Sequence, residues 1–225
     1  MDGNGRWAKQ QDQPRIYGHN HATQAVRAAV EGSASLGVEV LTLFAFSTEN
    51  WKRPAPEVEA LMELFVVYLH EELPRLIKNN IRLTTIGGEG RLPTRVTDLL
   101  SSSIETTKNN TGMVLCLAVD YGARDEITRM AQKLAQQAAQ GKLEPSQITE
   151  DLISDHLDTS GFPDLDLVIR TSGEQRLSNF LLWQAAYAEF YYTDLLWPEF
   201  NEAALKEAFA AYSQRNRRIG AVHDA

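Results

Sequence analysis

The sequence has a single cysteine, Cys116, among its 225 residues. One cysteine cannot form a disulfide within the chain or supply a thiolate zinc site, so a reducing compartment is the expected setting. Long apolar runs are also absent. Residues 177–188 are the longest stretch without Asp, Glu, Lys or Arg, whereas a spanning helix needs about 20 residues. The polar N-terminus lacks the apolar core of a signal peptide. These absences predict a soluble, cytoplasmic protein.

Positively charged residues are also fewer than negatively charged ones. Lys and Arg number 22 against 30 Asp and Glu, which gives a formal net charge of −8 at pH 7. A general nucleic-acid binder would normally be basic, so no nucleic-acid partner is expected. The chain contains no Walker-type loop, Gly-x-Ser-x-Gly or Cys-x-x-Cys motif, which argues against kinases, ATPases and phosphatases.

The apolar pattern of the chain predicts alternating strands and helices. The strands are expected at residues 38–46, 81–86, 113–119 and 165–169, and the helices at 22–37, 57–79, 93–108, 125–140, 144–157 and from the Trp-Pro turn at 197–198 to about 218. Residues 1–20 are expected to form a loop, residues 47–56 a polar loop, and the residues after 179 an apolar helix or a helix–strand pair. Such alternation predicts an α/β fold, a single domain over residues 1–225, with a mainly parallel central sheet flanked by helices.

Polar residues gather in three clusters, and ligands of open α/β sheets bind at the carboxyl ends of strands. The first cluster is residues 2–6, Asp-Gly-Asn-Gly-Arg, with Arg15 and His19 beyond it. Glycines on both sides of an asparagine allow backbone N–H groups to converge on an anion, and Arg6 adds a charged fork. The pattern is compatible with a phosphate-binding loop, but Asn-Gly alone is a very common turn, so on spacing alone a mobile N-terminal turn is favoured.

The other two clusters follow predicted strands. Residues 46–54 combine hydroxyls, an amide, two cations and the Trp51 indole, which suits either a ligand-binding loop or a loop anchored by a buried tryptophan. Residues 166–179 place Arg170 and Arg176 on either side of hydroxyls and a glycine. This spacing favours a diphosphate clamp over two solvated arginines.

Two carboxylates need an explanation in these surroundings. Asp2 would repel an anion in its own loop unless Mg²⁺ bridges it to a diphosphate. Glu189 stands alone in the apolar stretch 183–192, where it would be costly to bury unpaired, so it is expected to pair with an arginine or to serve a metal site. The residues therefore indicate a Mg²⁺–diphosphate enzyme.

Together these clusters resemble the cis-prenyltransferases, and within that family the bacterial undecaprenyl diphosphate synthases. The resemblance is carried by residues 1–8, Arg15, residues 18–19, 47–54, 166–170, 176–184 and 188–189. It runs from residue 1 to about residue 220, and several long motifs in one order are more specific than any single glycine-rich turn.

The resemblance implies a Mg²⁺-dependent enzyme that adds isopentenyl diphosphate repeatedly, with cis geometry, to an allylic primer such as farnesyl diphosphate. The product would be undecaprenyl diphosphate, the lipid carrier precursor for cell-wall glycan synthesis. Asp2 and Asn50 would be catalytic, with Asp2 and Glu189 at the metal. The substrate-binding residues would be Gly3, Asn4, Gly5, Arg6, Trp7, Arg15 and His19 for the allylic diphosphate, Arg170, Arg176 and Ser178 for isopentenyl diphosphate, and Ser47, Thr48, Glu49, Trp51 and Arg53 in a loop that closes over both.

The same resemblance implies an apolar tunnel, a homodimer and a peripheral contact with the inner face of the membrane for product release. Residues 64–69 would form the tunnel wall and Met113 its floor, although such a helix could equally be buried core. The family's C-terminal Arg-x-Gly resembles residues 218–220, so Arg218 would complete the neighbouring subunit's site. The alternative is that the arginines at 215–218 complement the dipole of a helix.

The chain also departs from the family pattern. The family has an apolar strand directly before the position of Asp2, so this first strand is expected to be missing from residues 1–225. Asp120 stands where asparagine is commoner, which adds a negative charge near the site. A non-catalytic binding or scaffold subunit is the alternative function. Such relatives tend to lose the aspartate or the arginine clamp, and Asp2, Arg170, Arg176 and the Arg-x-Gly ending are all present.

Overall fold

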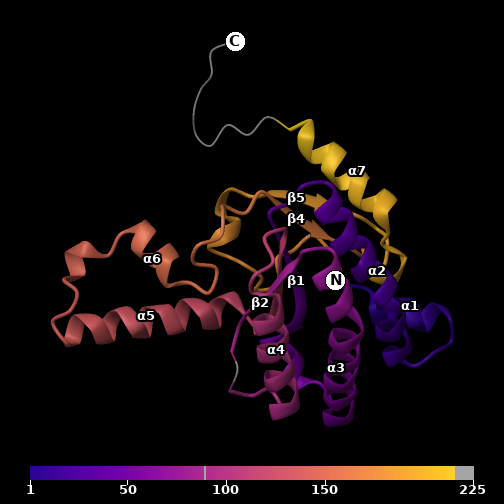
Figure 1. The fold of residues 1–225 in the computed structure, drawn as a ribbon, viewed down its shortest axis with the longest axis horizontal. Helices are drawn as coiled ribbons and strands as arrows, with labels where there is room; N and C mark the ends of the chain where they lie inside the picture. The colour runs from indigo at the N-terminus through magenta and orange to yellow at the C-terminus, as the bar shows by residue number, and fades with distance from the viewer. Residues whose placement is uncertain (89, 216–225) are drawn as a thin grey trace. The chain divides into compact units, whose positions relative to one another are not determined.

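The computed structural model describes residues 1–88 and 90–215, and Figure 1 shows their helices and strands. The internal contacts divide the chain into two compact units. Unit 1 comprises residues 1–38, 164–176 and 183–225, and unit 2 comprises residues 39–163 and 177–182. Each unit combines strands with helices, which confirms the α/β prediction.

Unit 2 contains a three-stranded parallel sheet in the order β1-β3-β2. Its strands are β1 (Val40–Ser47), β2 (Arg82–Ile86) and β3 (Val114–Tyr121). Every residue of β3 is buried, as the near-continuous apolar run predicts for a strand covered on both faces. Because the strands are parallel, their carboxyl ends meet at one edge of the sheet, where the loops after them begin, although the β1–β3 register shifts between Phe44 and Ser47.

The helices of unit 2 follow the predicted order, with two adjustments. They are η1 (Thr48–Lys52), α3 (Ala55–Lys78), α4 (Thr94–Thr107), α5 (Ala123–Ala139), η2 (Pro145–Gln147) and α6 (Glu150–His156). Part of the predicted 47–56 loop is the 3₁₀ helix η1. The helix predicted over residues 144–157 is divided, because Thr149 caps a new helix by accepting a hydrogen bond from the Leu152 N–H at 3.2 Å.

Unit 1 contains a parallel pair of short strands, β4 (Leu167–Arg170) and β5 (Glu189–Tyr192). Its other elements are α1 (Asn4–Gln10), α2 (Arg15–Ser35), η3 (Gln184–Tyr187), η4 (Trp197–Glu199) and α7 (Glu202–Ser213). The segment after residue 179 is therefore a helix–strand pair. The last helix ends at Ser213, short of the predicted end near residue 218, and Arg218 lies outside the described residues.

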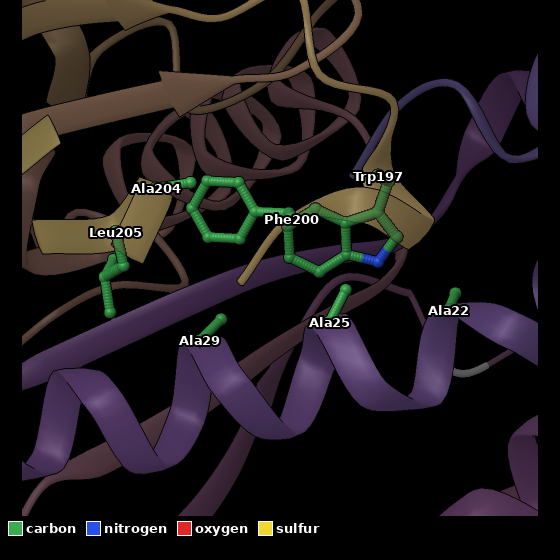
Figure 2. Close-up of a cluster of buried hydrophobic side chains, with 7 residues drawn as sticks. All are labelled: Ala22, Ala25, Ala29, Trp197, Phe200, Ala204 and Leu205. Atoms are coloured by element: carbon green, nitrogen blue, oxygen red, sulfur yellow. The ribbon is translucent and has the colours of Figure 1, made fainter. Parts of the chain in front are cut away.

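The apolar core of unit 1 lies between α2 and the segment from η4 to α7. Figure 2 shows Ala22, Ala25 and Ala29 along one side of α2, facing the rings of Trp197 and Phe200. The two rings stack with centroids 5.3 Å apart. Small side chains on the helix leave room for large ones opposite, and each large side chain buried in this way contributes about 1.5–3 kcal/mol.

The prediction of a loop over residues 1–20 is wrong. Residues 4–10 form α1 and residues 15–20 form the first turns of α2, which pack against each other, and within this segment only residues 1–3 and 11–14 lie outside a helix. At the crossing Gly18 lies so close to α1 that an added methyl group would be 1.9 Å from the Asn4 carbonyl oxygen. Trp7 of α1 also stacks on Tyr17 of α2, with ring centroids 5.8 Å apart. Tertiary contact, not an apolar repeat, stabilises this short helix, so the periodicity gave no signal.

Among the helices within residues 1–88 and 90–215, none combines the length and the apolar character needed to span a membrane. The tunnel expected along residues 64–69 stays a prediction. Val67 in that stretch is exposed, Leu69 is buried, and Met113 is buried just before β3.

Candidate active site

In unit 1, Asp2 is fixed at the carboxyl end of β4 through its backbone. The Asp2 N–H donates to the Thr171 hydroxyl oxygen at 3.0 Å, and that hydroxyl donates to the Asp2 carbonyl oxygen at 2.7 Å. The same carbonyl accepts a hydrogen bond from the Trp197 N–H at 2.9 Å. These three bonds hold the main chain and leave the carboxylate available for other partners.

The Asp2 carboxylate faces two arginines. One oxygen lies 3.0 Å from Nη2 of Arg170 and the other lies 3.5 Å from Nη2 of Arg6. Burial by itself raises the pKa of the Asp2 carboxyl, but the hydrogen bond and charge of Arg170 and the charge of Arg6 outweigh it and hold the pKa below its usual range. Asp2 is therefore ionised at neutral pH, as a metal ligand must be.

A chain of contacts extends this cluster to Arg176. Arg6 donates to the Ser172 hydroxyl at 2.6 Å and lies 3.1 Å from Glu174. Glu174 also pairs with Arg176, whose hydrogen bond lowers the pKa of that carboxyl, and Arg170 donates to the Arg176 carbonyl oxygen. Three guanidinium groups thus share two carboxylates. The excess positive charge, with the donors held by fixed partners, suits binding of a diphosphate.

The start of α1 adds further groups beside this cluster. Gly3 has φ 107°, a left-handed conformation that favours glycine, and an added methyl group there would lie 3.0 Å from Leu196. Asn4 is buried, and its Oδ1 has no hydrogen-bond partner among the described residues. The Arg15 guanidinium lies over Gly5, where a methyl group would be 2.9 Å from it. Residues 3–6 and Arg15, predicted to bind one diphosphate, are thus brought together.

Trp7 and His19 are placed on the same pair of helices. Trp7 contacts Tyr17 and His21, with the His21 ring centroid 5.1 Å away, so its ring belongs to an aromatic cluster. His19 follows Gly18 on α2 and is half-buried. Their predicted roles in substrate binding stay predictions.

Unit 2 carries the second group of predicted site residues, on η1. The Ser47 N–H donates to Asn50 Oδ1 at 2.9 Å, so the predicted catalytic asparagine also caps the turn that carries it. Thr48 donates to Glu49 at 3.2 Å, and Arg53 lies 3.1 Å from Glu57 in the first turn of α3. The loop is therefore an ordered turn at the carboxyl end of β1.

Asn179 joins η1 to the segment that contains Ser178. Its Nδ2 donates to Glu49 at 2.8 Å and its Oδ1 accepts from the Arg124 N–H at 2.8 Å. Burial by itself raises the pKa of the Glu49 carboxyl. The hydrogen bond from Asn179 and those from the residues next to Glu49 outweigh burial and hold this pKa below its usual value. Ser178 and Asn179 have φ values of 51° and 64°. This strained turn carries both Ser178 and Asn179, and Asn179 in turn holds Glu49.

Glu189 is not placed with Asp2. It opens β5 opposite Leu167, whereas Asp2 contacts Arg170 at the far end of β4. The Glu189 carboxylate accepts a hydrogen bond from Arg215 at 2.6 Å. Of the two expectations for this residue, pairing with an arginine is the one seen in the chain, and its part in a metal site stays a prediction.

The donor set around Asp2 fits a magnesium ion that arrives with its substrate. No cluster of three or more His, Cys, Asp or Glu suited to a metal occurs within the described part of the chain. Mg²⁺ commonly binds through one or two carboxylates together with substrate phosphates. Asp2 supplies one ionised carboxylate beside an arginine cluster suited to a diphosphate, which is that arrangement.

A family model described as "Putative undecaprenyl diphosphate synthase" matches residues 1–220 of the chain. The chain belongs to this prenyltransferase family. It is 51% identical over 220 residues to the ditrans,polycis-undecaprenyl-diphosphate synthase ((2E,6E)-farnesyl-diphosphate specific) of Photorhabdus laumondii, which covers 98% of this chain and 87% of that one. It is 49% identical over 226 residues to the isoprenyl transferase of Streptococcus thermophilus, with 99% and 91% covered.

Solved structures agree with this membership of the prenyltransferase family. The crystal structure of lavandulyl diphosphate synthase from Lavandula x intermedia, in complex with dimethylallyl diphosphate, has a TM-score of 0.95 at 37% identity and covers 98% of this chain and 95% of that chain. A probable undecaprenyl diphosphate synthase from Campylobacter jejuni has a TM-score of 0.79 at 36% identity, with 89% and 92% covered.

Several residues that organise the site in this family member were not assigned roles from the sequence. Thr171 fixes the backbone of Asp2, and Ser172 and Glu174 hold Arg6. Asp120 contacts Trp51 and Arg91. The sequence offered a signal for Thr171, Ser172 and Glu174, because these residues lie between the two arginines of the predicted diphosphate clamp. For Arg91 no local pattern marked the contact.

Proposed function

We propose that the chain is a Mg²⁺-dependent cis-prenyltransferase that condenses isopentenyl diphosphate repeatedly onto farnesyl diphosphate to make undecaprenyl diphosphate. The observation that carries this proposal is the ionised Asp2 carboxylate held between Arg170 and Arg6. The relatives at about half identity supply the substrate class, because the Photorhabdus enzyme is described as farnesyl-diphosphate specific.

The residues of the chain have separable tasks in this reaction. Arg6 binds the allylic diphosphate and stabilises the charge that develops on it as the allylic bond breaks, and Arg170 and Arg176 bind the diphosphate of isopentenyl diphosphate. Asp2 would hold Mg²⁺, and the bound ion would supply further neutralisation of the departing diphosphate. The ordered turn η1, with Asn50 and Trp51, contributes to closure that keeps water away from the reacting carbon.

Homodimer formation and a peripheral membrane contact belong to the same proposal. A long polyprenyl product is almost wholly apolar, so its release is favoured at a bilayer surface. Nothing within the described residues favours the scaffold alternative, since the groups that a non-catalytic relative tends to lose are present and mutually paired.

The test is incubation of the protein with labelled isopentenyl diphosphate, Mg²⁺ and a primer, followed by sizing of the extracted products. Farnesyl diphosphate should give a ladder that converges on one long product, which EDTA abolishes. A parallel reaction uses dimethylallyl diphosphate, the molecule present in the lavandulyl diphosphate synthase structure, in place of farnesyl diphosphate. The matched control is Asp2→Asn, which keeps the shape and removes the charge. It should lower kcat at least about 100-fold. No incorporation with either primer would contradict the proposal.

A further inference from the structure

The carboxylate of Asp120 is buried at the carboxyl end of β3, with its side chain 2% exposed. Three N–H groups of unit 2 converge on it. Arg91 donates from Nε to Oδ2 at 3.1 Å and from Nη2 to Oδ1 at 2.5 Å, and Trp51 donates from Nε1 to Oδ1 at 2.7 Å. A buried carboxylate requires such partners, and a two-bond contact with a guanidinium fixes its orientation.

The sheet topology explains why these groups meet. β3 lies between β1, which leads into η1, and β2, which leads into the loop that contains Arg91. Asp120 is therefore placed between the two loops. Its backbone has φ 49°, and its carbonyl oxygen accepts a hydrogen bond from the Gly88 N–H at 3.1 Å, which ties the second loop to the strand end.

The Trp51 ring is held on its other sides too. Phe46 contacts it edge-on, with centroids 5.0 Å apart, and Cζ of Arg91 lies 5.6 Å from the centroid of the indole. The charge of Arg91 thus acts on both partners, on Asp120 through hydrogen bonds and on Trp51 through a cation–π contact. The direction of the indole is set by the single N–H that points at Asp120.

We propose that Asp120 is a positioning residue that fixes Trp51, and through it η1, in a conformation ready to bind substrate, with Arg91 orienting the Asp120 carboxylate. This inference rests on the proposed function for the role of η1 in binding. A loop that is ordered beforehand loses less conformational freedom when the substrate binds. Removal of Asp120 leaves the indole N–H without its acceptor and releases η1, so substrate binding weakens more than the chemical step.

The kinetic test uses Asp120→Ala, Trp51→Phe and the double variant. Each single change should raise KM for the allylic diphosphate about tenfold, as expected for loss of a hydrogen bond to a charged group, with kcat altered less than about threefold. The double variant should be no worse than either single one, because both remove the same contact. Asp120→Asn keeps an acceptor oxygen for the indole and should restore most of the affinity. Additive effects in the double variant would overturn the proposal.

A second readout does not depend on activity. The fluorescence of Trp51 is obtained by subtracting the signal of the matching Trp51→Phe protein from that of the protein that keeps Trp51. Its quenching by acrylamide is then measured. Asp120→Ala should raise the Trp51 quenching constant about twofold, and Arg91→Gln, at a side chain that is 51% exposed, should raise it by a smaller amount. The control is Glu126→Gln, a buried carboxylate of unit 2 that accepts from Tyr121 and the Asp158 N–H and should leave Trp51 unchanged.

These readouts separate the two proposals. If the wild-type protein forms no product but Asp120→Ala still exposes Trp51, the proposed function fails and the positioning of Trp51 by Asp120 stands. If product forms and neither KM nor quenching responds to Asp120→Ala or Arg91→Gln, the positioning role is overturned while the proposed function stands.

Discussion

The ion pair between Asp2 and Arg170 should make stability depend on pH in a defined direction. The pKa of Asp2 in the folded protein lies below its ordinary value of 3.8, so the pair stabilises the fold above about pH 4 and this contribution is lost as the pH falls through the lowered pKa. Thermal unfolding of wild type and Asp2→Asn should therefore differ at pH 7 and converge below pH 4. Because the Asp2 side chain is 37% exposed, the difference at pH 7 should not exceed about 1 kcal/mol. A difference that does not change with pH would show that the pair does not stabilise the fold.

Also at the scale of residues, the sequence identifies the charged groups of the site more readily than it identifies the residues that hold those groups in place. Asp2, Arg6 and Arg170 stand out because charged residues interrupt glycine-rich or apolar surroundings. The contacts of their anchors do not stand out, even where an anchor lies between the two clamp arginines. Thr171 meets Asp2 across 169 positions of the chain, and Asp120 meets Trp51 across 69. No local pattern encodes such contacts, because they are created by the packing of strands and loops.

Replacing two buried methionines separately tests the expected tunnel, because the comparison distinguishes a change in product length from a change in stability. Met113 and Met130 are each 6% exposed, and Met113 directly precedes β3 whereas Met130 lies on α5. Replacing either with alanine should cost about 2–5 kcal/mol of stability. Only Met113→Ala should also lengthen the polyprenyl product, since Met113 is the predicted tunnel floor. Product sizing beside denaturant unfolding checks both effects, and an unchanged product with Met113→Ala would remove Met113 from the tunnel.

At the scale of elements, strands and long helices follow from the sequence, and α1 does not. β3 is predicted because its apolar run matches a strand buried on both faces. α1 has only seven residues and begins after a left-handed glycine, so it shows no apolar period. Its stability depends on contact with α2 at Gly18, which local sequence cannot reveal.

At the crossing of α1 and α2, we expect a Gly→Ala substitution to destabilise the protein, which is the opposite of its usual effect inside a helix. Gly→Ala inside a helix usually stabilises it by up to about 1 kcal/mol. At Gly18 the new methyl group would lie 1.9 Å from the Asn4 backbone, so Gly18→Ala should instead destabilise by at least about 1 kcal/mol and displace α1. The control is Gly32→Ala in the same helix, where the nearest atom, 2.8 Å away, is the tip of the Leu205 side chain and can move. Denaturant midpoints compare the two, and equal effects would contradict the role of the crossing.

At the scale of the whole molecule, the alternation of strands and helices predicts the fold class, and the similarity to solved prenyl diphosphate synthases bears it out. The sequence cannot give the division into two units, because each unit is assembled from segments far apart in the chain. The chain passes between the units at residues 38–39, 163–164, 176–177 and 182–183. A chain that crosses so often cannot readily unfold one unit without disturbing the ends of the other.

We therefore expect one cooperative unfolding transition, which is the behaviour that the predicted single domain over residues 1–225 requires. The chain offers a probe for each unit. In Trp51→Phe, the remaining tryptophans Trp7, Trp183 and Trp197 all belong to unit 1, so fluorescence reports on that unit alone. Cys116, the one cysteine, is buried in β3 of unit 2.

The thiol chemistry makes Cys116 a strict reporter of unfolding. Burial raises its pKa to about 12, helped by the charges of Asp158 and Glu126 and opposed by a hydrogen bond from Thr42. At pH 8 the folded thiol is protonated and shielded, whereas an unfolded cysteine, with a pKa near 8.5, is partly ionised and reacts quickly with a disulfide reagent. The urea midpoint for Cys116 labelling should coincide with the fluorescence midpoint of the same Trp51→Phe protein, because a single cooperative unit exposes both probes together. Midpoints that differ would show that unit 1 and unit 2 unfold as separate domains.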